Sequence, residues 1–538
     1  MEHFQESFTD AERAVLSRFF TNTDGPVFAL VNLPEVVKGA LFARYSRSAK
    51  SVRRLFLDEF VANPETGIEA MASALDGGDK QLDLKRAEDL YRRVFFEYGD
   101  DSVAQLGGVH LACEQASNIL TKVLEWGRLA AYLEQSTRYV PYDGRLGGSF
   151  RYRVPPEIEG TDLAARFAGT ADRLFATYAD MAGQMRSIYE DRFPRQEGDS
   201  VGVWNATIKA KAFDAVRGLL PAATISNVGM YATGQAYEMA LVRMRSNPLL
   251  EVREYSDLML TELRKVIPSF LTRVDLEGRG VAWSDYLADV RDRLSIEAES
   301  IPSSRTAGRE VTLTEWDPET EVKLAAAALY AVSEASDQDL LERARRMTET
   351  ELATVINAAM GARTNRRHKP GRSAERSSYR FDVVCDFGAF RDLQRHRMMT
   401  IEWQPLTTRL GFDLPEDVAA AGLGERWEAA MEEADRLYED LRETVGVDVA
   451  QYAVPLAFNI RFVMQLNLRQ AFHLLELRTQ PAGHPAYRWV CQEMHRQIAE
   501  VAGHRLLAAA MTFVDESVVD LERLESERKA EARRLASA

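Results

Sequence analysis

Three basic residues stand next to one another in the second half of the chain, in the order Arg395, His396 and Arg397. If the stretch is a helix, Arg391 and Arg395 lie one turn apart on the same face, where like charges repel each other. Guanidinium groups bind phosphate through paired hydrogen bonds, and an imidazole can donate or accept a proton. The cluster therefore predicts an anion site, although a solvated basic turn would have the same sequence.

A second polar set follows in residues 463–478, which we predict to be one helix with an apolar stripe. Asn467 and Arg478 fall within that stripe, and Arg469 and His473 pair one turn apart on another face. Removing the partner of a buried ion pair typically costs about 3–5 kcal/mol, so a buried Arg478 needs an anion or a polar ligand. A carboxylate such as Glu476 or Glu493 would serve this need as well as a bound ligand would.

Two loops carry further candidate residues. In the first half, Glu134, Gln135, Ser136 and Arg138 offer a carboxylate, an amide, a hydroxyl and a guanidinium within five residues, which suits an anion or a nucleotide. In the second half, residues 363–376 are basic and are interpreted either as a phosphate or polyglutamate site or as a mobile charged loop. We find no phosphate-binding glycine loop, no nucleophile elbow and no metal-ligand spacing.

The elements that must position these residues are mostly helices. Apolar spacing predicts helices at 11–20, 33–45, 52–61, 87–98, 234–245, 249–265, 321–334, 337–359, 425–445, 457–479 and 487–514. Residues 104–131 are expected to form a buried helix, or a strand followed by a helix, and residues 379–386 a strand. We place a first domain at 1–300, a linker at 301–319, a second domain at 320–515 and a charged helical tail at 516–538.

The two domains are predicted to be copies of each other. The run that ends in Arg478 and Pro481 is similar to the run that ends in Arg245 and Pro248. Arg395 to Arg397 falls where the first half has Trp126, Gly127 and Arg128. The first half must hold extra residues between these anchors, and we expect them within 144–202. Two like domains in one chain often pack as a pseudo-symmetric dimer.

Composition limits the class of protein. The 538 residues carry a net charge of −15, which disfavours nucleic-acid binding because the overall field repels phosphate. The three cysteines show no pairing or metal spacing, and with an acidic, polar N-terminus they favour a reducing, cytoplasmic location. No apolar run approaches the length of a membrane span.

Taken together, these motifs resemble flavin-dependent thymidylate synthase, the ThyX family. Its signature is Arg-His-Arg, seven residues, then Ser-x-Arg. The second half keeps the front of the signature at Arg395 to Arg397, and the first half keeps the back at Ser136 and Arg138. The resemblance implies an α+β fold with two tandem ThyX-like domains, mainly helical with a sheet in each, packed as a pseudo-dimer. Two chains would then form a homodimer that imitates the family's tetramer.

The resemblance also implies cofactors and roles. FAD would be recharged by NADPH and would help move a one-carbon unit from methylenetetrahydrofolate to the uracil of dUMP. The residues that would hold FAD are Arg395, His396, Arg397, Asn467, Arg469, His473 and Glu375. Those that would hold the nucleotide are Glu134, Gln135, Ser136, Arg138 and Arg478, and Arg478 would also favour the charge that develops on the pyrimidine, a catalytic role.

Each half has kept what the other has lost, which predicts one composite site made from both. The reciprocal site, around Trp126 and Gly127, is predicted to be free of flavin. Alternatives are a flavoenzyme for another pyrimidine nucleotide and a non-catalytic flavin or nucleotide sensor. A nucleic-acid binder that uses residues 363–376 is disfavoured by the net charge.

Overall fold

The computed structural model describes residues 6–25, 28, 30–35, 37, 38, 41, 50–62, 105–138, 140–197, 199–302 and 308–517. The chain divides into two compact units. Unit 1 comprises Met1–Glu114, Leu129–Glu134 and Asn227–Ile301, and unit 2 comprises Gln115–Arg128, Gln135–Ser226 and Pro302–Ala538. The boundary therefore does not follow the two predicted halves, because unit 2 contains much of the first half together with the second.

Unit 1 is built on a three-stranded sheet in the order β1-β3-β2, with β1 at Gly108–Ser117, β2 at Ala130–Glu134 and β3 at Ile225–Thr233. β2 pairs antiparallel with β3. The predicted helices at 234–245 and 249–265 are confirmed as α9 (Gly234–Arg245) and α10 (Leu250–Leu263), and α11 (Ala282–Ala298) follows. The shorter helices α1 (Asp10–Phe19) and α3 (Val52–Leu55) belong to the same unit.

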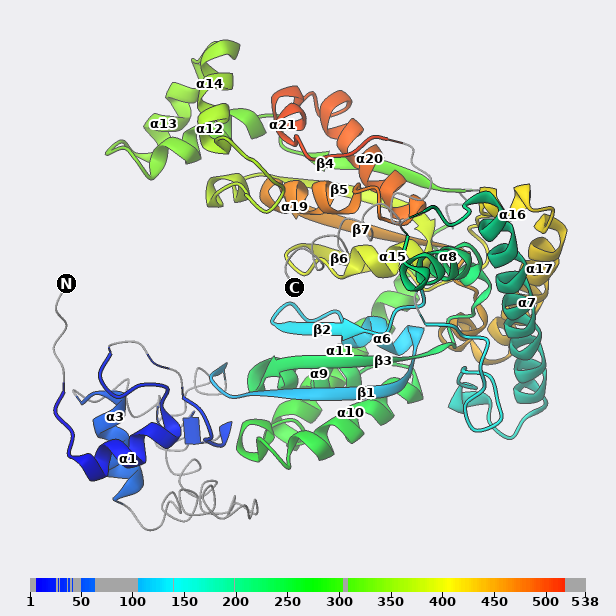
Figure 1. The fold of residues 1–538 in the computed structure, drawn as a ribbon, viewed down its shortest axis with the longest axis horizontal. Coiled ribbons are helices and arrows are strands. Elements are labelled where there is room, and N and C mark those ends of the chain that lie inside the picture. The colour runs from blue at the N-terminus through cyan, green and yellow to red at the C-terminus, as the bar shows by residue number, and fades with distance from the viewer. Residues whose placement is uncertain are drawn as a thin grey trace. The chain divides into compact units, whose positions relative to one another are not determined.

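Unit 2 contains a four-stranded antiparallel sheet in the order β4-β5-β7-β6 (Figure 1). Its strands are β4 (Glu310–Trp316), β5 (Ser378–Asp386), β7 (Asn459–Asn467) and β6 (Thr400–Trp403). Helices α19 (Leu468–Arg478) and α20 (Pro485–Glu500) pack on this sheet. The two sheets and the many helices give an α+β fold, as predicted.

Three elements predicted at 301–319, 463–478 and 487–514 are wrong. The helix expected at 463–478 begins only at Leu468, because Ile460, Phe462, Met464 and Leu466 alternate inward along β7. Most of the expected linker is ordered, since residues 310–316 form β4 against β5. The helix expected at 487–514 stops at Glu500 and resumes only as α21 (Arg505–Ala510), after Gly503 at φ +76°.

Other predictions need smaller changes. Residues 337–359 form two helices, α13 (Asp337–Arg345) and α14 (Glu349–Met360), because Thr348 caps the second through a capping box with Glu351. Helix α12 spans Thr320–Tyr330, and residues 104–131 include β1 and then α6 (Asn118–Leu124). The helices predicted at 33–45 and 87–98 and the tail after 517 lie wholly or largely outside the described residues.

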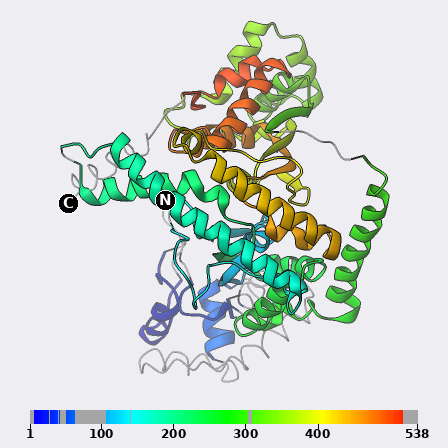
Figure 2. The same cartoon turned by 90° about the vertical axis from the view of Figure 1, so that its right-hand side faces the viewer.

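The first half is longer where extra residues were expected. Helix α7 (Asp162–Arg192) has 31 residues and α17 (Gly424–Val445) has 22, and the two lie side by side (Figure 2). Helix α8 (Val201–Val216) follows α7, whereas only the four residues of α18 (Val447–Ala450) follow α17. Arg426 and Asp180 form an ion pair between α17 and α7 at 2.7 Å.

Within unit 2 the two halves meet through reciprocal hydrogen bonds. The Ala222 N–H donates to the Val454 carbonyl at 2.8 Å, and the Leu456 N–H donates to the Leu220 carbonyl at 2.9 Å. Ala222 lies three residues before β3 and Leu456 lies three residues before β7, so the two residues are counterparts. The second hydrogen bond is therefore equivalent to the first, with the roles of the two halves exchanged. Such an exchange is characteristic of a two-fold contact. Pseudo-dimer packing of the complete copies remains a prediction.

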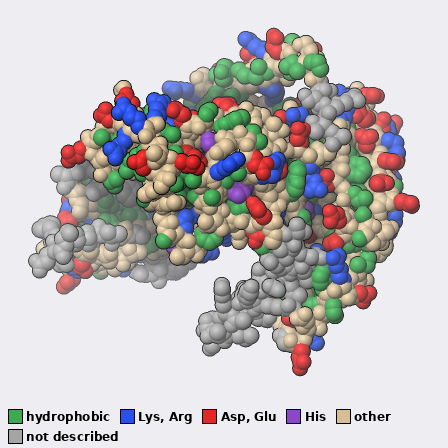
Figure 3. All heavy atoms as spheres, turned by 90° about the horizontal axis from the view of Figure 1, so that it is seen from above, with side chains coloured by type: hydrophobic (Ala, Val, Ile, Leu, Met, Phe, Trp, Pro, Cys, Tyr) green, Lys and Arg blue, Asp and Glu red, His purple; other side chains and the backbone are tan. Residues whose placement is uncertain are grey.

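The surface charges and the character of the helices are relevant to which partners the protein could have. On the face seen in Figure 3, Lys and Arg side chains are interspersed with Asp and Glu, and hydrophobic side chains are exposed between them. None of the helices in the described part of the chain has both the length and the apolar character that crossing a membrane requires.

Candidate active site

A cavity of about 160 Å³ lies at the junction of β7 and α19. Four of the residues predicted to bind the cofactor line it: Glu375, Asn467, Arg469 and His473. Lys369, Met398 and Gln470 complete the lining. Since these side chains come from positions nearly a hundred residues apart, their convergence supports this cavity as the candidate site.

The strand-to-helix junction explains how the cavity forms. Asn467 ends β7 and caps α19, with its Oδ1 accepting the Gln470 N–H at 2.8 Å. Arg469 donates to the Pro370 carbonyl and to Glu375 Oε1, both at 2.9 Å. Because Thr233 caps α9 in the same way, it is the counterpart of Asn467.

The imidazoles beside the cavity are held neutral. Burial, reinforced by the charges of Lys369 and Arg366, lowers the pKa of His473 to about 4. Burial and the Arg478 guanidinium hold the pKa of His396 far below its usual value. Arg478 Nε donates to His396 Nε2 at 2.8 Å, and the two imidazole rings are 5.3 Å apart. His396 therefore accepts at Nε2 and does not act as a cation.

Arg478 does not pair with the carboxylates that we expected. Glu476 is bound by Arg363 and Glu493 by Arg496. Its carboxylate is Asp392, 3.6 Å away, and its Nη2 also donates to the Asp392 carbonyl oxygen at 2.6 Å. The predicted catalytic guanidinium is thus held by Asp392 and His396.

Asp392 lies on α15 (Phe387–Gln394), a helix that ends just before the Arg-His-Arg motif. Its carboxylate is within 3.6–3.9 Å of Arg478, Arg395 and Arg217. Burial alone would raise its pKa, but these cations hold it below the usual value. Arg391 and Arg395 were expected to repel each other, and the Asp392 carboxylate reduces that repulsion. Arg397 follows, half-buried, with no hydrogen bond or ion pair to any described residue.

The first-half loop lies in the same unit as this motif. Arg138 forms two hydrogen bonds to Asp214, at 2.9 and 2.8 Å, and its N–H donates to Ser136 Oγ at 3.2 Å. Arg391 Nη1 donates to Thr137 Oγ1 at 3.4 Å, which joins the loop to α15. Gln135 accepts the Ser226 hydroxyl through its carbonyl at 3.3 Å. Glu134 is the last residue of β2 and is assigned to unit 1.

Four residues of the cluster were not predicted from the sequence: Asp214, Arg217, Asp392 and His484. Arg217 lies between Asp214 (3.5 Å) and Asp392 (3.9 Å), and its Nη2 is buried without a hydrogen-bond partner among the described residues. His484 is 4.0 Å from Asp214, and burial together with Arg217 lowers its pKa to about 3. One signal could have revealed Arg217: it opens the short turn before β3, where the second copy has Gln451.

The cluster carries more positive than negative charge. Four guanidiniums, those of Arg138, Arg217, Arg395 and Arg478, surround the carboxylates of Asp214 and Asp392. Arg395 is exposed, whereas Arg138, Arg217 and Arg478 are buried or half-buried, so with both imidazoles neutral three such cations face two carboxylates. A buried excess of charge is costly unless an anion binds, so this geometry favours an anionic ligand such as a phosphate monoester.

The reciprocal position has no such excess. Trp126 Nε1 donates to the Ile401 carbonyl at 3.4 Å, and Arg128 donates to Thr400 Oγ1 at 3.0 Å. The counterpart of Arg138 is Arg409, which forms two hydrogen bonds to Glu439 at 2.8 and 2.7 Å. Each of these polar groups is matched within the protein.

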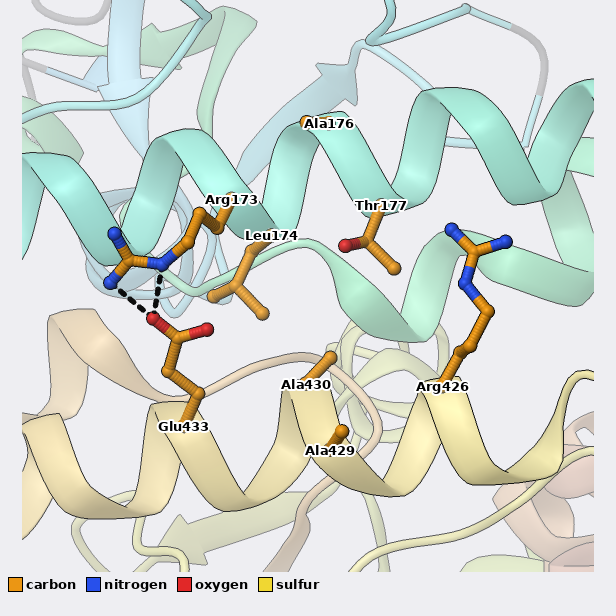
Figure 4. A pocket seen from close by; sticks show the side chains of 8 residues that line it. All are labelled: Arg173, Leu174, Ala176, Thr177, Arg426, Ala429, Ala430 and Glu433. Carbon is orange, nitrogen blue, oxygen red and sulfur yellow. Dashed lines mark hydrogen bonds and ion pairs between the residues drawn. The ribbon is translucent and has the colours of Figure 1, made fainter.

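A larger hollow of about 360 Å³ lies between α7 and α17 (Figure 4). It is lined by two arginines, a glutamate and small or apolar side chains, and Arg173 is held by Glu433 across it. None of the predicted site residues lines this hollow. We therefore assign the candidate site to the smaller cavity and its cationic cluster.

Comparison with known proteins places the chain in a family. The model of the thymidylate synthase complementing protein family matches residues 54–269 and again 311–503. A UPF0159 protein of Chlamydia muridarum is 39% identical over 98% of this chain and 99% of its own length. A flavin-dependent thymidylate synthase of Clostridium tetani is 25% identical over 39% of this chain and 82% of its own length.

Among solved structures, a UMP/dUMP methylase of Streptomyces cacaoi is similar over 39% of this chain and 100% of its own, with 18% identity and a TM-score of 0.30. The two matched segments cover most of the sequence, one in each half. The chain belongs to the thymidylate synthase complementing protein family and carries the family's domain in tandem.

Proposed function

We propose that the chain is a thymidylate synthase-like methyltransferase that converts dUMP to dTMP with methylenetetrahydrofolate and NADPH, through FAD. The observation that carries this proposal is the positive excess of the Arg138–Arg217–Arg395–Arg478 cluster. Through the contact between Arg478 and His396 the cluster extends to the cavity that Asn467, Arg469 and His473 line. Membership of the family supports the same reaction class.

The donors around the cavity fit a flavin dinucleotide. Lys369 and Arg469 bring positive charge to a ligand with two phosphates, and Asn467 and Gln470 offer amides. In this proposal FAD is held by these residues together with Arg395, His396, Arg397, His473 and Glu375. FAD supplies the redox chemistry when bound, so the protein needs no nucleophile of its own.

The nucleotide is proposed to bind at the cationic cluster. Ser136 and Arg138, with Glu134 and Gln135 beside them, hold the dUMP, and the buried Nη2 of Arg217 donates to its phosphate. Arg478 turns from His396 and Asp392 towards the uracil, where a guanidinium stabilises negative charge on the carbonyl side. His396 stays neutral and aligns Arg478 from behind.

Three measurements test this proposal. The purified protein should be yellow and release FAD on denaturation. It should release tritium from 5-labelled dUMP when supplied with NADPH and methylenetetrahydrofolate, and it should support growth of a thymidine-requiring host. A protein that binds FAD but does neither would contradict the assigned reaction and favour a sensor or another pyrimidine nucleotide.

We also propose that two chains associate in a cytoplasmic homodimer, in place of the four chains implied by the family resemblance. Light scattering of the purified protein at several concentrations should give a mass near twice the 60.6 kDa of the chain. A mass of one chain, or of four, would contradict this assembly.

A further inference from the structure

The basic loop at 363–376 contains two kinds of cation. Arg363 forms a buried ion pair with Glu476, and Arg376 forms two hydrogen bonds to Asp337 at 2.6 and 2.8 Å. These two arginines hold the ends of the loop in place. Arg363 and Arg376 are therefore not available to bind an anion in this segment.

The cations between these ends have no acidic partner among the described residues. They are Arg366, Arg367, Lys369 and Arg372. The single acid of the segment, Glu375, is paired with Arg469. A net charge of −15 already favours solubility, so four cations without an acidic partner in one loop need another explanation.

Hydrogen bonds hold the loop in one conformation, and part of it lines the cavity. The Arg363 side chain donates to the His368 carbonyl at 2.6 Å, and the Arg367 N–H donates to Asn365 Oδ1 at 2.9 Å. The Pro370 carbonyl accepts from Arg469 at 2.9 Å. Lys369 lines the cavity, whereas Arg367 and Arg372 are exposed to solvent. The cations thus lead from the cavity lining to the surface.

We propose that Arg366, Arg367 and Arg372 form a subsite for the γ-linked oligoglutamate tail of the folate carbon donor. Cellular folates carry such tails, whose carboxylates are spaced along an extended chain. Arg366 is half-buried and Arg367 and Arg372 are exposed, so the three offer separate charges to such a chain, whereas a compact phosphate is better held by clustered, buried donors. This inference rests on the proposed function, because it assumes that the donor is a folate.

Exposed charge pairs each contribute a modest amount, about 0.2–1 kcal/mol, which corresponds to a factor of roughly 1.4–5 in affinity. Three such pairs should make the pentaglutamate bind about tenfold more tightly than the monoglutamate. The advantage should fall as salt rises, because the Debye length is about 10 Å at 0.1 M ionic strength.

The test measures the Kd of tetrahydrofolate monoglutamate and pentaglutamate by titration calorimetry, using the FAD-bound protein with dUMP. The triple variant Arg366→Gln/Arg367→Gln/Arg372→Gln should lose the preference for the pentaglutamate and bind the monoglutamate within about twofold of the wild type. The matched control is Arg376→Gln, which removes a cation from the same segment that Asp337 already neutralises, and it should keep the preference.

Three outcomes would overturn the inference. The first is equal affinity of the wild type for both folates, and the second is an unchanged preference in the triple variant. The third is a variant that loses NADPH affinity relative to NADH while keeping the folate preference, because the loop would then bind the dinucleotide 2′-phosphate. The proposed function survives any of these results if dUMP is still methylated, whereas failure of both folates to bind counts against the function itself.

Discussion

Replacing Asp386 by Asn should change how the stability of the protein depends on pH. Asp386 ends β5 and caps α15, with its Oδ1 accepting the Ala389 N–H at 2.8 Å. Its side chain is buried, and its Oδ2 has no hydrogen-bond partner among the described residues. Burial and the nearby Asp413 raise its pKa from 3.8 to about 7. The folded protein therefore binds this proton more tightly than the unfolded chain does.

The sign and size of the effect follow from this pKa. The tighter binding stabilises the fold below pH 3.8, and this stabilisation is lost as pH rises from there to about 7. At about 1.4 kcal/mol per pKa unit, the wild type should lose roughly 3 kcal/mol between pH 5 and pH 8 through this group. Asn keeps the cap and carries no titrating proton, so Asp386→Asn should remove that loss.

Urea unfolding at pH 5, 6, 7 and 8, followed by tryptophan fluorescence, would measure the effect for both proteins. The free energies of unfolding should diverge with pH, and the variant should be the more stable one at pH 8. Asp191→Asn, at an exposed site near the end of α7, serves as the control. Parallel pH dependences for Asp386→Asn and the wild type would refute the reasoning, because the carboxyl would then be ionised at little cost.

Two other predictions concern the flavin and the core. Arg395→Ala and Asn467→Ala should each weaken FAD binding by roughly tenfold or more without unfolding the chain, because a charge-assisted hydrogen bond contributes about 1.5–3 kcal/mol; unchanged FAD retention in both would contradict the assignment. Arg363→Met should destabilise the fold by about 3–5 kcal/mol in urea titrations, since it leaves Glu476 buried without its partner, and the double variant Arg363→Met/Glu476→Leu should recover much of that loss. A double variant as unstable as the single one would show that the ion pair is not the cause.

Local sequence patterns predicted much of the helical structure. Helices α9, α10 and α17 were predicted within about two residues because each has a continuous apolar stripe and a clear end signal. The junction at Asn467 was not predicted because residues 460–466 form a short apolar run. Such a run can belong either to a strand or to a buried helix, and periodicity alone does not distinguish the two. The strand at 310–316 was read as a linker because its residues are polar on the exposed face.

The sequence indicated which types of residue form the site better than it indicated which residues they contact. The types at Asn467, Arg469 and His473 indicated a polar cavity, and the structure brings them together with Glu375. That Arg478 is held by Asp392 and Arg138 by Asp214 depends on contacts between distant segments, which no local pattern encodes. Arg217 was detectable only by comparing the two copies position by position.

We infer that each chain contains one composite site, made from the first-half loop and the second-half motif. Arg138 and Arg409 offer a matched pair, because each forms two hydrogen bonds to a single carboxylate and occupies the same place in its copy. Titration of the FAD-bound protein with dUMP should give one site per chain, abolished by Arg138→Ala and preserved in Arg409→Ala. Equal losses in the two variants, or two nucleotides and two FAD per chain, would contradict the account.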